Sequence, residues 1–218
     1  ATGPNQVWSW DISYCPSAVR GQHWYLYLVL DIYSRKIVAW EIHDAESGML
    51  AKQLIERALL REGCWNKPPV LHSDNGAPMT SHTLRARLAE LGMPMSHSRP
   101  RVSNDNPYSE SLFRTLKYCP AWPSKGFASL VEGRDWMLAF ENAYNNHHLH
   151  SGINFVTPSA RHTGKDLEQL QHRKRVYEAA KRRNPRRWSK ATRNWKPVGA
   201  VSLNPGKLQE IELNKSAA

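Results

Sequence analysis

Three carboxylates in this 218-residue sequence occupy positions from which they could act on one substrate. Asp11 lies inside a strand-like run, and Asp74 ends the apolar run that starts at Val70. Glu110 lies near the start of a helix that begins at Pro107. Acidic side chains that converge without basic partners repel one another, so divalent cations usually hold them. The three residues are therefore candidate metal ligands.

Oxygen ligands alone select hard cations, which favours Mg²⁺ or Mn²⁺. Two such ions about 3.5–4 Å apart can activate an attacking oxygen and stabilise the leaving oxygen of a phosphodiester. We therefore expect Asp11, Asp74 and Glu110 to be both catalytic residues and ligands of two ions. Each acid also has a structural interpretation. Asp11 can be an ion-pair partner within a strand, Asp74 a turn residue, and Glu110 a first-turn carboxylate that the helix dipole favours.

Basic side chains accompany the acids. Arg114 and Lys117 follow Glu110 at helical spacing and should share its face of the helix. Arg99 and Arg101 lie in a polar stretch without periodicity, which predicts a mobile loop. We expect all four basic residues to line a path for DNA, although Lys117 can also be a solvated helix residue.

The elements that would position these residues follow from hydrophobic periodicity. Short links predict antiparallel pairing among the first three strands. A helical crossover predicts that the strand from Val70 is parallel to the first. Asn106 or Asn104 is available to cap the helix at Pro107. Together these features predict an α/β fold with a mixed five-stranded sheet flanked by helices. The expected strands are 6–14, 23–31, 36–42, 70–72 and 94–98, and the expected helices are 49–63, 83–91, 107–117 and 130–150.

Asp31 and a group of histidines have competing interpretations. Asp31 ends an apolar strand near the same sheet, and we expect it to be structural and to pair with Arg35. His147, His148 and His150 suggest zinc, but Cys/His pairs at finger-like spacing are absent from the sequence. Contact with phosphate is the favoured interpretation for His147 or His148.

The charge is unevenly distributed. Residues 1–118 hold 13 Lys+Arg against 11 Asp+Glu, whereas residues 119–218 hold 17 against 8. A basic appendage on a nearly neutral core indicates a polyanionic partner, most often nucleic acid. No apolar run is long enough to cross a bilayer, and three widely spaced cysteines suit reduced thiols. We therefore expect a cytoplasmic, DNA-binding protein without a membrane partner.

The basic residues concentrate in 161–196, which hold 13 Lys+Arg against three acids, with Trp188 and Trp195 interleaved. Aromatic side chains in a basic run suit packing or stacking on DNA. We divide the chain into a catalytic core, 1–155, and a basic DNA-contacting extension, 156–218, with a small strand-like unit at Val198–Leu203. The candidate DNA-binding residues of the extension are Arg182, Arg183, Arg186, Arg187 and Trp188.

The spacing of the three acids resembles a known pattern. Thirty-five residues separate Asp74 from Glu110, as in the D,D(35)E arrangement of retroviral-integrase-like transposases. Several blocks also resemble the transposases of bacterial insertion sequences, over about residues 5–200. These blocks are Trp8–Ile12, Leu30–Arg35, His72–Gly76, Asn106–Ser111 and Tyr144–Ile153.

The resemblance implies a ribonuclease H-like fold and Mg²⁺-dependent cleavage of element ends, followed by transfer of a 3′-hydroxyl into target DNA. It implies that Asp11, Asp74 and Glu110 bind the metal and that Lys117 contacts the DNA backbone. It also implies a bacterial, nucleoid-associated protein that forms at least a dimer on DNA. We expect this chain to be the catalytic part, without the N-terminal region that reads the terminal repeats.

Two alternatives stay open from the sequence. One is a nuclease of the same fold that hydrolyses DNA without strand transfer. The other is a non-catalytic DNA-binding module whose acids are structural.

Overall fold

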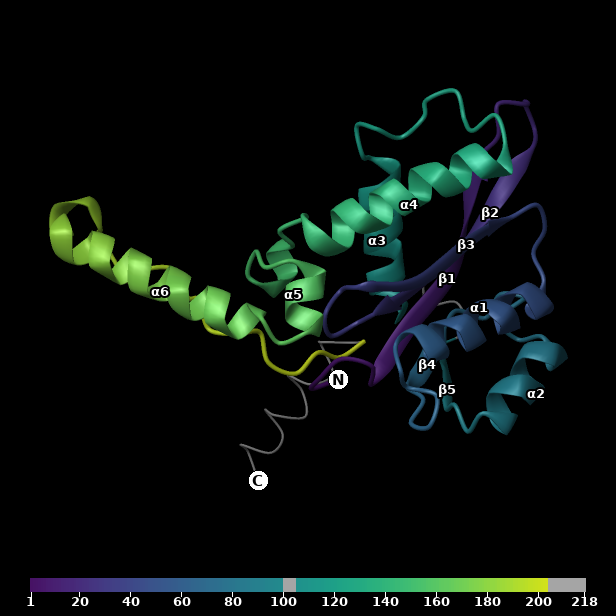
Figure 1. Ribbon diagram of the computed structural model, residues 1–218, viewed down its shortest axis with the longest axis horizontal. Coiled ribbons are helices and arrows are strands. Elements are labelled where there is room, and N and C mark those ends of the chain that lie inside the picture. Colours follow the sequence, from purple (N-terminus) through teal and green to yellow (C-terminus); the bar gives the residue numbers. More distant parts are fainter. Residues whose placement is uncertain (100–104, 204–218) are drawn as a thin grey trace.

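The computed structural model describes residues 1–99 and 105–203, and its centre is a five-stranded mixed sheet (Figure 1). The strands lie in the order β3-β2-β1-β4-β5. β1 pairs antiparallel with β2 and parallel with β4, β2 pairs antiparallel with β3, and β4 pairs parallel with β5. The predicted pairing is therefore confirmed. The strands are β1 Val7–Pro16, β2 His23–Asp31, β3 Ile37–His43, β4 Val70–Ser73 and β5 Met95–His97.

Helices cover both faces of this sheet, and β2 shows why. Its alternate residues Tyr27 and Val29 pack into a core with the helices α1 and α2, Gly48–Arg61 and His82–Glu90. Its other residues, such as Leu28, pack into a second core with the helices α3 and α4. A strand buried on both faces is apolar at nearly every position, as β2 is. The bounds of the second helix pair are α3 Pro107–Lys117 and α4 Leu130–Asn146.

The helix ends follow local signals in the sequence. Ser47 caps α1 by accepting a hydrogen bond from the backbone N–H of Met49. Gly63 and Gly92 follow α1 and α2 with φ of 66° and 64°, a left-handed conformation in which glycine avoids steric strain. The prediction for the helix over 130–150 was too long. It ends at Asn146, and His150 instead forms a β-bridge with Val156.

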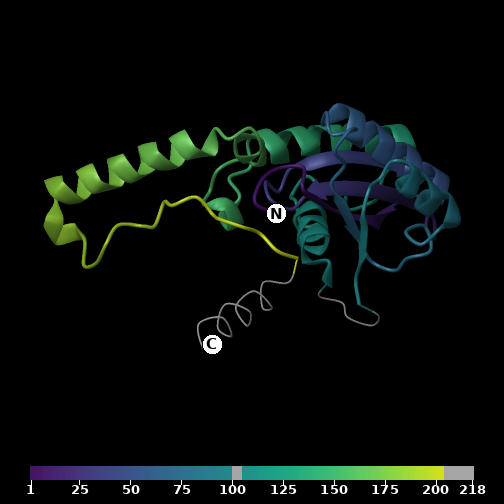
Figure 2. The same cartoon turned by 90° about the horizontal axis from the view of Figure 1, so that it is seen from below.

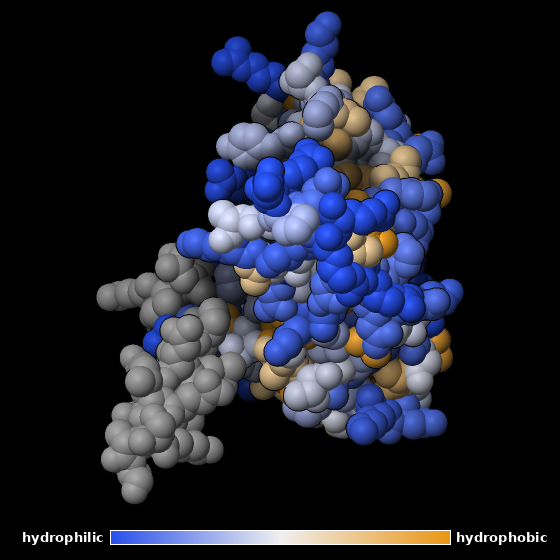
Figure 3. All heavy atoms as spheres, turned by 90° about the vertical axis from the view of Figure 1, so that its left-hand side faces the viewer, coloured by the Kyte–Doolittle hydropathy of each residue, from blue (hydrophilic) through white to orange (hydrophobic). Residues whose placement is uncertain are grey.

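Beyond α4 the chain forms an extension that projects from the sheet (Figures 1 and 2). It contains the short helices η2 and α5, the long helix α6, and the helical turn η3, after which an extended segment returns toward the N-terminus. Viewed from the free end of α6, the surface is mainly hydrophilic (Figure 3). The bounds are η2 Ser151–Ile153, α5 Pro158–His162, α6 Asp166–Arg183 and η3 Pro185–Arg187. No helix within 1–99 and 105–203 is long and apolar enough to span a membrane.

The extension is attached to the core by buried polar contacts. The Arg161 guanidinium donates to the backbone oxygens of Tyr33 and Val198, at 2.7 and 2.9 Å. The strand-like unit predicted at Val198–Leu203 is wrong, because this segment has no strand. Within this segment, Val201 exchanges two backbone hydrogen bonds with Ala1, but these two bonds are not extended into a paired strand among the described residues.

Candidate active site

The strand register places Asp11 and Asp74 side by side. In the parallel pairing of β1 with β4, Ser9 is opposite His72. Asp11 and Asp74 each follow their member of this pair by two residues. Because side chains alternate across a strand, two residues further along returns to the same face of the sheet. Asp11 and Asp74 therefore lie just beyond the last paired residues of β1 and β4, on the face of the sheet that α3 covers.

A tight turn fixes the backbone at Asp74. One carboxylate oxygen, Oδ1, accepts a hydrogen bond from the backbone N–H of Gly76 at 2.9 Å. A Cβ at Gly76 would lie 2.9 Å from the Met79 sulfur and 3.1 Å from that oxygen, so a larger residue would displace the Met79 side chain. Asp74 thus makes a turn contact, which engages one of its two carboxylate oxygens.

A buried polar cluster attaches α3 to β1 beside the acids. The Ser9 hydroxyl lies 2.6 Å from that of Ser109 and donates to the Asn106 side-chain oxygen. The Asn106 amide donates to the backbone oxygen of Trp10 at 3.3 Å. Because Ser109 precedes Glu110, these contacts bring the Glu110 backbone to the strand that carries Asp11.

The predicted capping role of Asn106 is wrong. Asn106 does occupy the residue before α3, yet its side chain makes no cap hydrogen bond, because β1 engages it instead. The other candidate cap, Asn104, lies outside the described residues.

Electrostatics show that the acids interact. Burial, together with the charges of Asp74 and Glu110, raises the pKa of Asp11 to about 7. The backbone N–H of Ile12 and the charge of Lys117 oppose this rise. Burial also raises the pKa of Glu110. The lysine charge reaches another residue of β1, where it partly offsets the burial that raises the pKa of Cys15. Three acids and one lysine from three elements thus share one electrostatic site.

The acids interact without forming a ready metal-binding group. Across the described part of the chain, no three His, Cys, Asp or Glu side chains are gathered closely enough to hold a metal ion. Like charges favour such a separation.

The basic residues predicted near the acids differ in their surroundings. Arg114 and Lys117 are exposed on α3. Arg99 is already paired, because its guanidinium donates two hydrogen bonds of 2.9 Å to the Asp105 carboxylate. Arg101, with most of the predicted mobile loop, lies outside the described residues.

Asp31 is structural, as predicted, but with other partners. Its buried carboxylate accepts hydrogen bonds from the backbone N–H groups of Asn5 and Ser34 and from the Ser34 hydroxyl, at 2.7–2.8 Å. The predicted pairing with the Arg35 side chain is wrong. Only the Arg35 backbone contacts Asp31, while the guanidinium lies over the Tyr108 ring, 3.9 Å from its centroid.

The histidines near the end of α4 take part in packing and turn contacts. His148 stacks on Tyr144 with ring centroids 5.3 Å apart. His150 accepts a hydrogen bond from the backbone N–H of Gly152. Contact of His147 or His148 with phosphate stays a prediction.

The two tryptophans of the extension also differ. Trp195 is buried against Ile153, Val156 and Leu170. Trp188 is partly exposed and meets Tyr177 edge-on. The predicted DNA-binding arginines are exposed at the free end of α6 and in η3: Arg182, Arg183, Arg186 and Arg187.

Sequence reasoning missed the Ser9, Asn106 and Ser109 cluster and the position of the Arg35 side chain. A signal for the cluster was available, because Ser9 is a polar residue two positions before Asp11, on the same face of the strand. Its partner 100 residues away could not be inferred from spacing.

Comparison with known proteins supports the fold. Residues 1–103 and residues 91–158 match two family models, each described as an integrase core domain. Solved structures share the fold at low sequence identity. The catalytic core of human T-cell lymphotropic virus 2 integrase, in complex with magnesium, has a TM-score of 0.51 and 15% identity, covering 73% of this chain and 97% of that one. The catalytic domain of the Mos1 mariner transposase has a TM-score of 0.52 and 18% identity, covering 64% and 71%.

Sheet order, helix placement and these matches define a ribonuclease H-like fold of the integrase core class. The two models together match residues 1–158, so this part of the chain belongs to the integrase core domain family. The relatives that the chain resembles in sequence include transposases of insertion sequences.

Two relatives illustrate this resemblance. The transposase of insertion sequence element IS904 from Lactococcus lactis is 30% identical over 163 residues, which cover 72% of this chain and 61% of the relative. Transposase InsF of insertion sequence IS3fB from Escherichia coli is 33% identical over 119 residues, which cover 54% and 40%. The chain thus matches less than two thirds of the length of either relative.

Proposed function

We propose that this chain is the catalytic part of a DNA transposase that cleaves element ends and transfers the resulting 3′-hydroxyl into target DNA. The observation that carries the proposal is that Asp11 on β1 interacts electrostatically with Asp74, at the end of β4, and with Glu110 on α3. The core domain would be residues 1–155 and the DNA-contacting extension residues 156–218.

The donor chemistry of the site fits a divalent cation. All three acids offer only oxygen, and the pKa of Asp11 is raised by burial and by its acidic neighbours, so added positive charge would stabilise the ionised site. Asp11, Asp74 and Glu110 would hold two Mg²⁺ or Mn²⁺ ions. Bound cations of this kind supply an activated attacking oxygen and charge stabilisation for the leaving oxygen.

The protein's own residues would orient the DNA. The buried Ser9 cluster fixes α3 against β1 and so holds Glu110 at the scissile phosphate. Lys117 and Arg114, which flank Glu110 on exposed positions of α3, would contact the DNA backbone next to it.

The extension would supply affinity for DNA that is independent of sequence. Exposed guanidinium groups at the end of α6 can contact phosphates, and the partly exposed Trp188 can stack on a base. Arg99 would contribute through the N–H groups that its contact with Asp105 leaves free, because its side chain is 56% exposed. We further propose that the protein works in the bacterial nucleoid and as at least a dimer, because two element ends must be cleaved together.

The decisive experiment measures plasmid nicking in Mg²⁺ or Mn²⁺ by the wild type and by Glu110→Gln, with DNA binding measured in parallel. We expect nicking by the wild type alone and equal binding by both proteins. Equal nicking by both would refute the role of Glu110. Binding that ignores both the metal and the substitution, without nicking, would favour a non-catalytic DNA-binding module.

A second assay separates transposase from nuclease. Pre-cut element ends are incubated with target plasmid, and joined products are measured. A nuclease of this fold would cleave the plasmid without joining it to the ends.

A further inference from the structure

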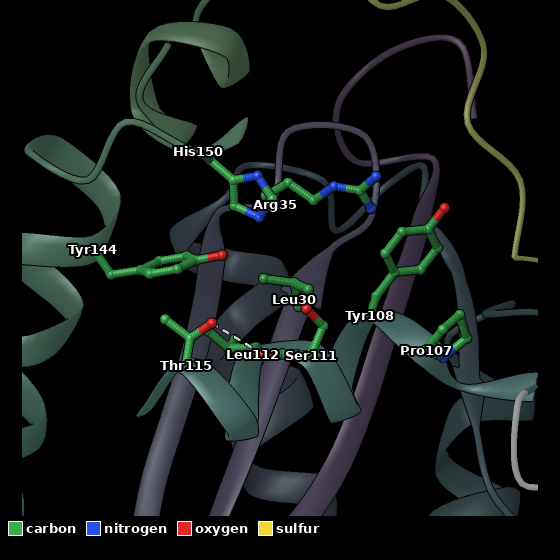
Figure 4. Close-up of a pocket in the computed structure, with 9 residues that line it drawn as sticks. All are labelled: Leu30, Arg35, Pro107, Tyr108, Ser111, Leu112, Thr115, Tyr144 and His150. Carbon is green, nitrogen blue, oxygen red and sulfur yellow. Dashed lines mark hydrogen bonds between the residues drawn. The ribbon is translucent and has the colours of Figure 1, made fainter. Parts of the chain in front are cut away.

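A polar cavity lies beside α3 and is lined by residues of that helix other than Glu110, Arg114 and Lys117 (Figure 4). Its volume is about 250 Å³, which is small for a drug-sized ligand and suits a single polar group. Within α3, Ser111 and Thr115 face this cavity, whereas Glu110 and Arg114 lie about 100° away around the helix. The lining residues are Leu30, Arg35, Pro107, Tyr108, Ser111, Leu112, Thr115, Tyr144 and His150.

Arg35 is the only lining residue with a permanent charge, and one of its nitrogens lacks a partner. Its guanidinium lies over the Tyr108 ring, and its Nη1 atom is buried with no hydrogen-bond partner among the described residues. A buried donor without a partner is costly, so such a group in a cavity indicates an absent acceptor. No lining residue is acidic, so the cavity itself offers no counter-charge.

The backbone of Arg35 supports the same conclusion. Its φ is 67°, in the left-handed region where glycine or asparagine would be less strained. The turn is held by a hydrogen bond from the Arg35 backbone N–H to the Asp31 oxygen, at 2.8 Å. An arginine in this strained position therefore serves through its side chain rather than through its fit to the turn.

Further hydrogen-bonding groups converge on the cavity. The hydroxyls of Ser111 and Tyr144 point toward its centre (Figure 4). The His150 Nδ1 atom accepts the Gly152 backbone N–H at 3.0 Å, so the neutral imidazole carries its proton on Nε2. Burial, with the charges of Arg35 and His148, lowers the pKa of His150 to about 4, which keeps the ring neutral at pH 7. The cavity therefore presents a cation and neutral hydrogen-bond donors.

We propose that this cavity binds a backbone phosphate of DNA, at a position separate from the phosphate that the acids cleave. The proposal rests on the proposed function, because it requires DNA to be the substrate. A guanidinium with hydroxyl and imidazole donors is the donor set that phosphate oxygens accept. The cavity lies between α3, which carries Glu110, and His150, from which the chain continues into the basic extension. DNA that runs from the extension to the acids would thus pass it.

The test compares two arginines in the turns at opposite ends of β2. Arg35→Gly removes the cation and relieves the positive φ, so the fold is expected to tolerate it. Arg20→Gly removes an exposed arginine from the turn between β1 and β2 and serves as the matched control. DNA binding is measured by fluorescence anisotropy in EDTA over a range of salt concentrations. Inorganic phosphate is added separately while the His150 imidazole signals are followed by NMR.

We expect Arg35→Gly to weaken DNA binding by about tenfold and to reduce the slope of log K against log salt by about one. Arg20→Gly should match the wild type. Equal effects of the two variants would overturn the proposal. So would NMR shifts with inorganic phosphate when DNA binding is unchanged by Arg35→Gly, because the cavity would then take the free anion.

The nicking assay tests the proposed catalysis separately from the proposed phosphate site. A wild type that binds DNA through Arg35 but does not nick it would preserve the phosphate site and refute catalysis. A wild type that nicks DNA, with binding unaffected by Arg35→Gly, would preserve catalysis and refute the phosphate site.

Discussion

The hydroxyl of Ser9 offers a direct test of how α3 is positioned. Ser9 is fully buried and contacts the Asn106 side-chain oxygen and the Ser109 hydroxyl. Ser9→Ala leaves the buried Asn106 oxygen without its donor, which costs about 1–3 kcal/mol. Because Glu110 follows Ser109, a shift of the helix start also displaces a proposed ligand. A misplacement of about 1 Å at a reacting centre can cost roughly 100-fold in rate.

The assay pairs urea unfolding with plasmid nicking in Mn²⁺. The control is Ser13→Ala, four residues along the same strand and on the same face. Ser13 is a buried residue, and its hydroxyl has no hydrogen bond among the described residues. We expect Ser9→Ala to lower both stability and nicking rate relative to this control. Equal stability of the two variants would refute the energetic argument. A loss of stability without a loss of nicking would show that the cluster stabilises α3 but does not position Glu110.

Three further predictions concern pH, the acids and the extension. Hydrogen bonds from His162 and Lys36 outweigh the burial of Glu62 and lower its pKa from 4.5 to about 2. The ionised Glu62 carboxylate should add about 3 kcal/mol to the free energy of unfolding above pH 4.5, and this contribution should be lost as the pH falls to 2. In urea unfolding, Glu62→Gln should therefore be less stable than the wild type at pH 7, and the difference should disappear near pH 2. The pKa of Asp11 is shifted in the opposite direction. Its raised pKa of about 7 means that the charge of Asp11 destabilises the fold as the pH rises above 3.8. Asp11→Asn should therefore increase the free energy of unfolding at pH 8 in EDTA, by up to about 4 kcal/mol before screening. Added Mg²⁺ should stabilise the wild type but not this variant. Substituting serine for the exposed arginines of the extension should reduce the salt dependence of DNA binding by up to about four units of slope, without changing the unfolding midpoint in urea. These arginines are Arg182, Arg183, Arg186 and Arg187.

The sheet could be predicted because its signals are local. β2 is apolar at nearly every position, which requires cover on both faces, and the short links before and after it permit only antiparallel neighbours. The crossover through α1 then makes β4 parallel to β1. From this register alone Asp11 and Asp74 must be neighbours, so two of the three acids follow from the order of the strands.

The placement of Glu110 could not be derived in the same way. It depends on side chains from β1 and from the start of α3 that meet across 100 residues. The helix-start signal at Asn106 and Pro107 was correct for the boundary, but the asparagine side chain contacts β1 instead of capping the helix. A residue suited to a local role was used for a tertiary contact, because a buried backbone oxygen at Trp10 needed a donor.

The tryptophans of the extension show what composition leaves undecided. Trp188 and Trp195 lie seven residues apart in one basic run, and their surroundings in the sequence are alike. The structure separates them by contacts with segments far upstream, because Trp195 is only 7% exposed and packs against Ile153 and Val156. Trp195 therefore stabilises the returning segment, and Trp188 is the tryptophan whose partly exposed ring is available to contact DNA. A basic run rich in aromatics indicates which region meets a polyanion, whereas the tertiary fold determines which side chain does so.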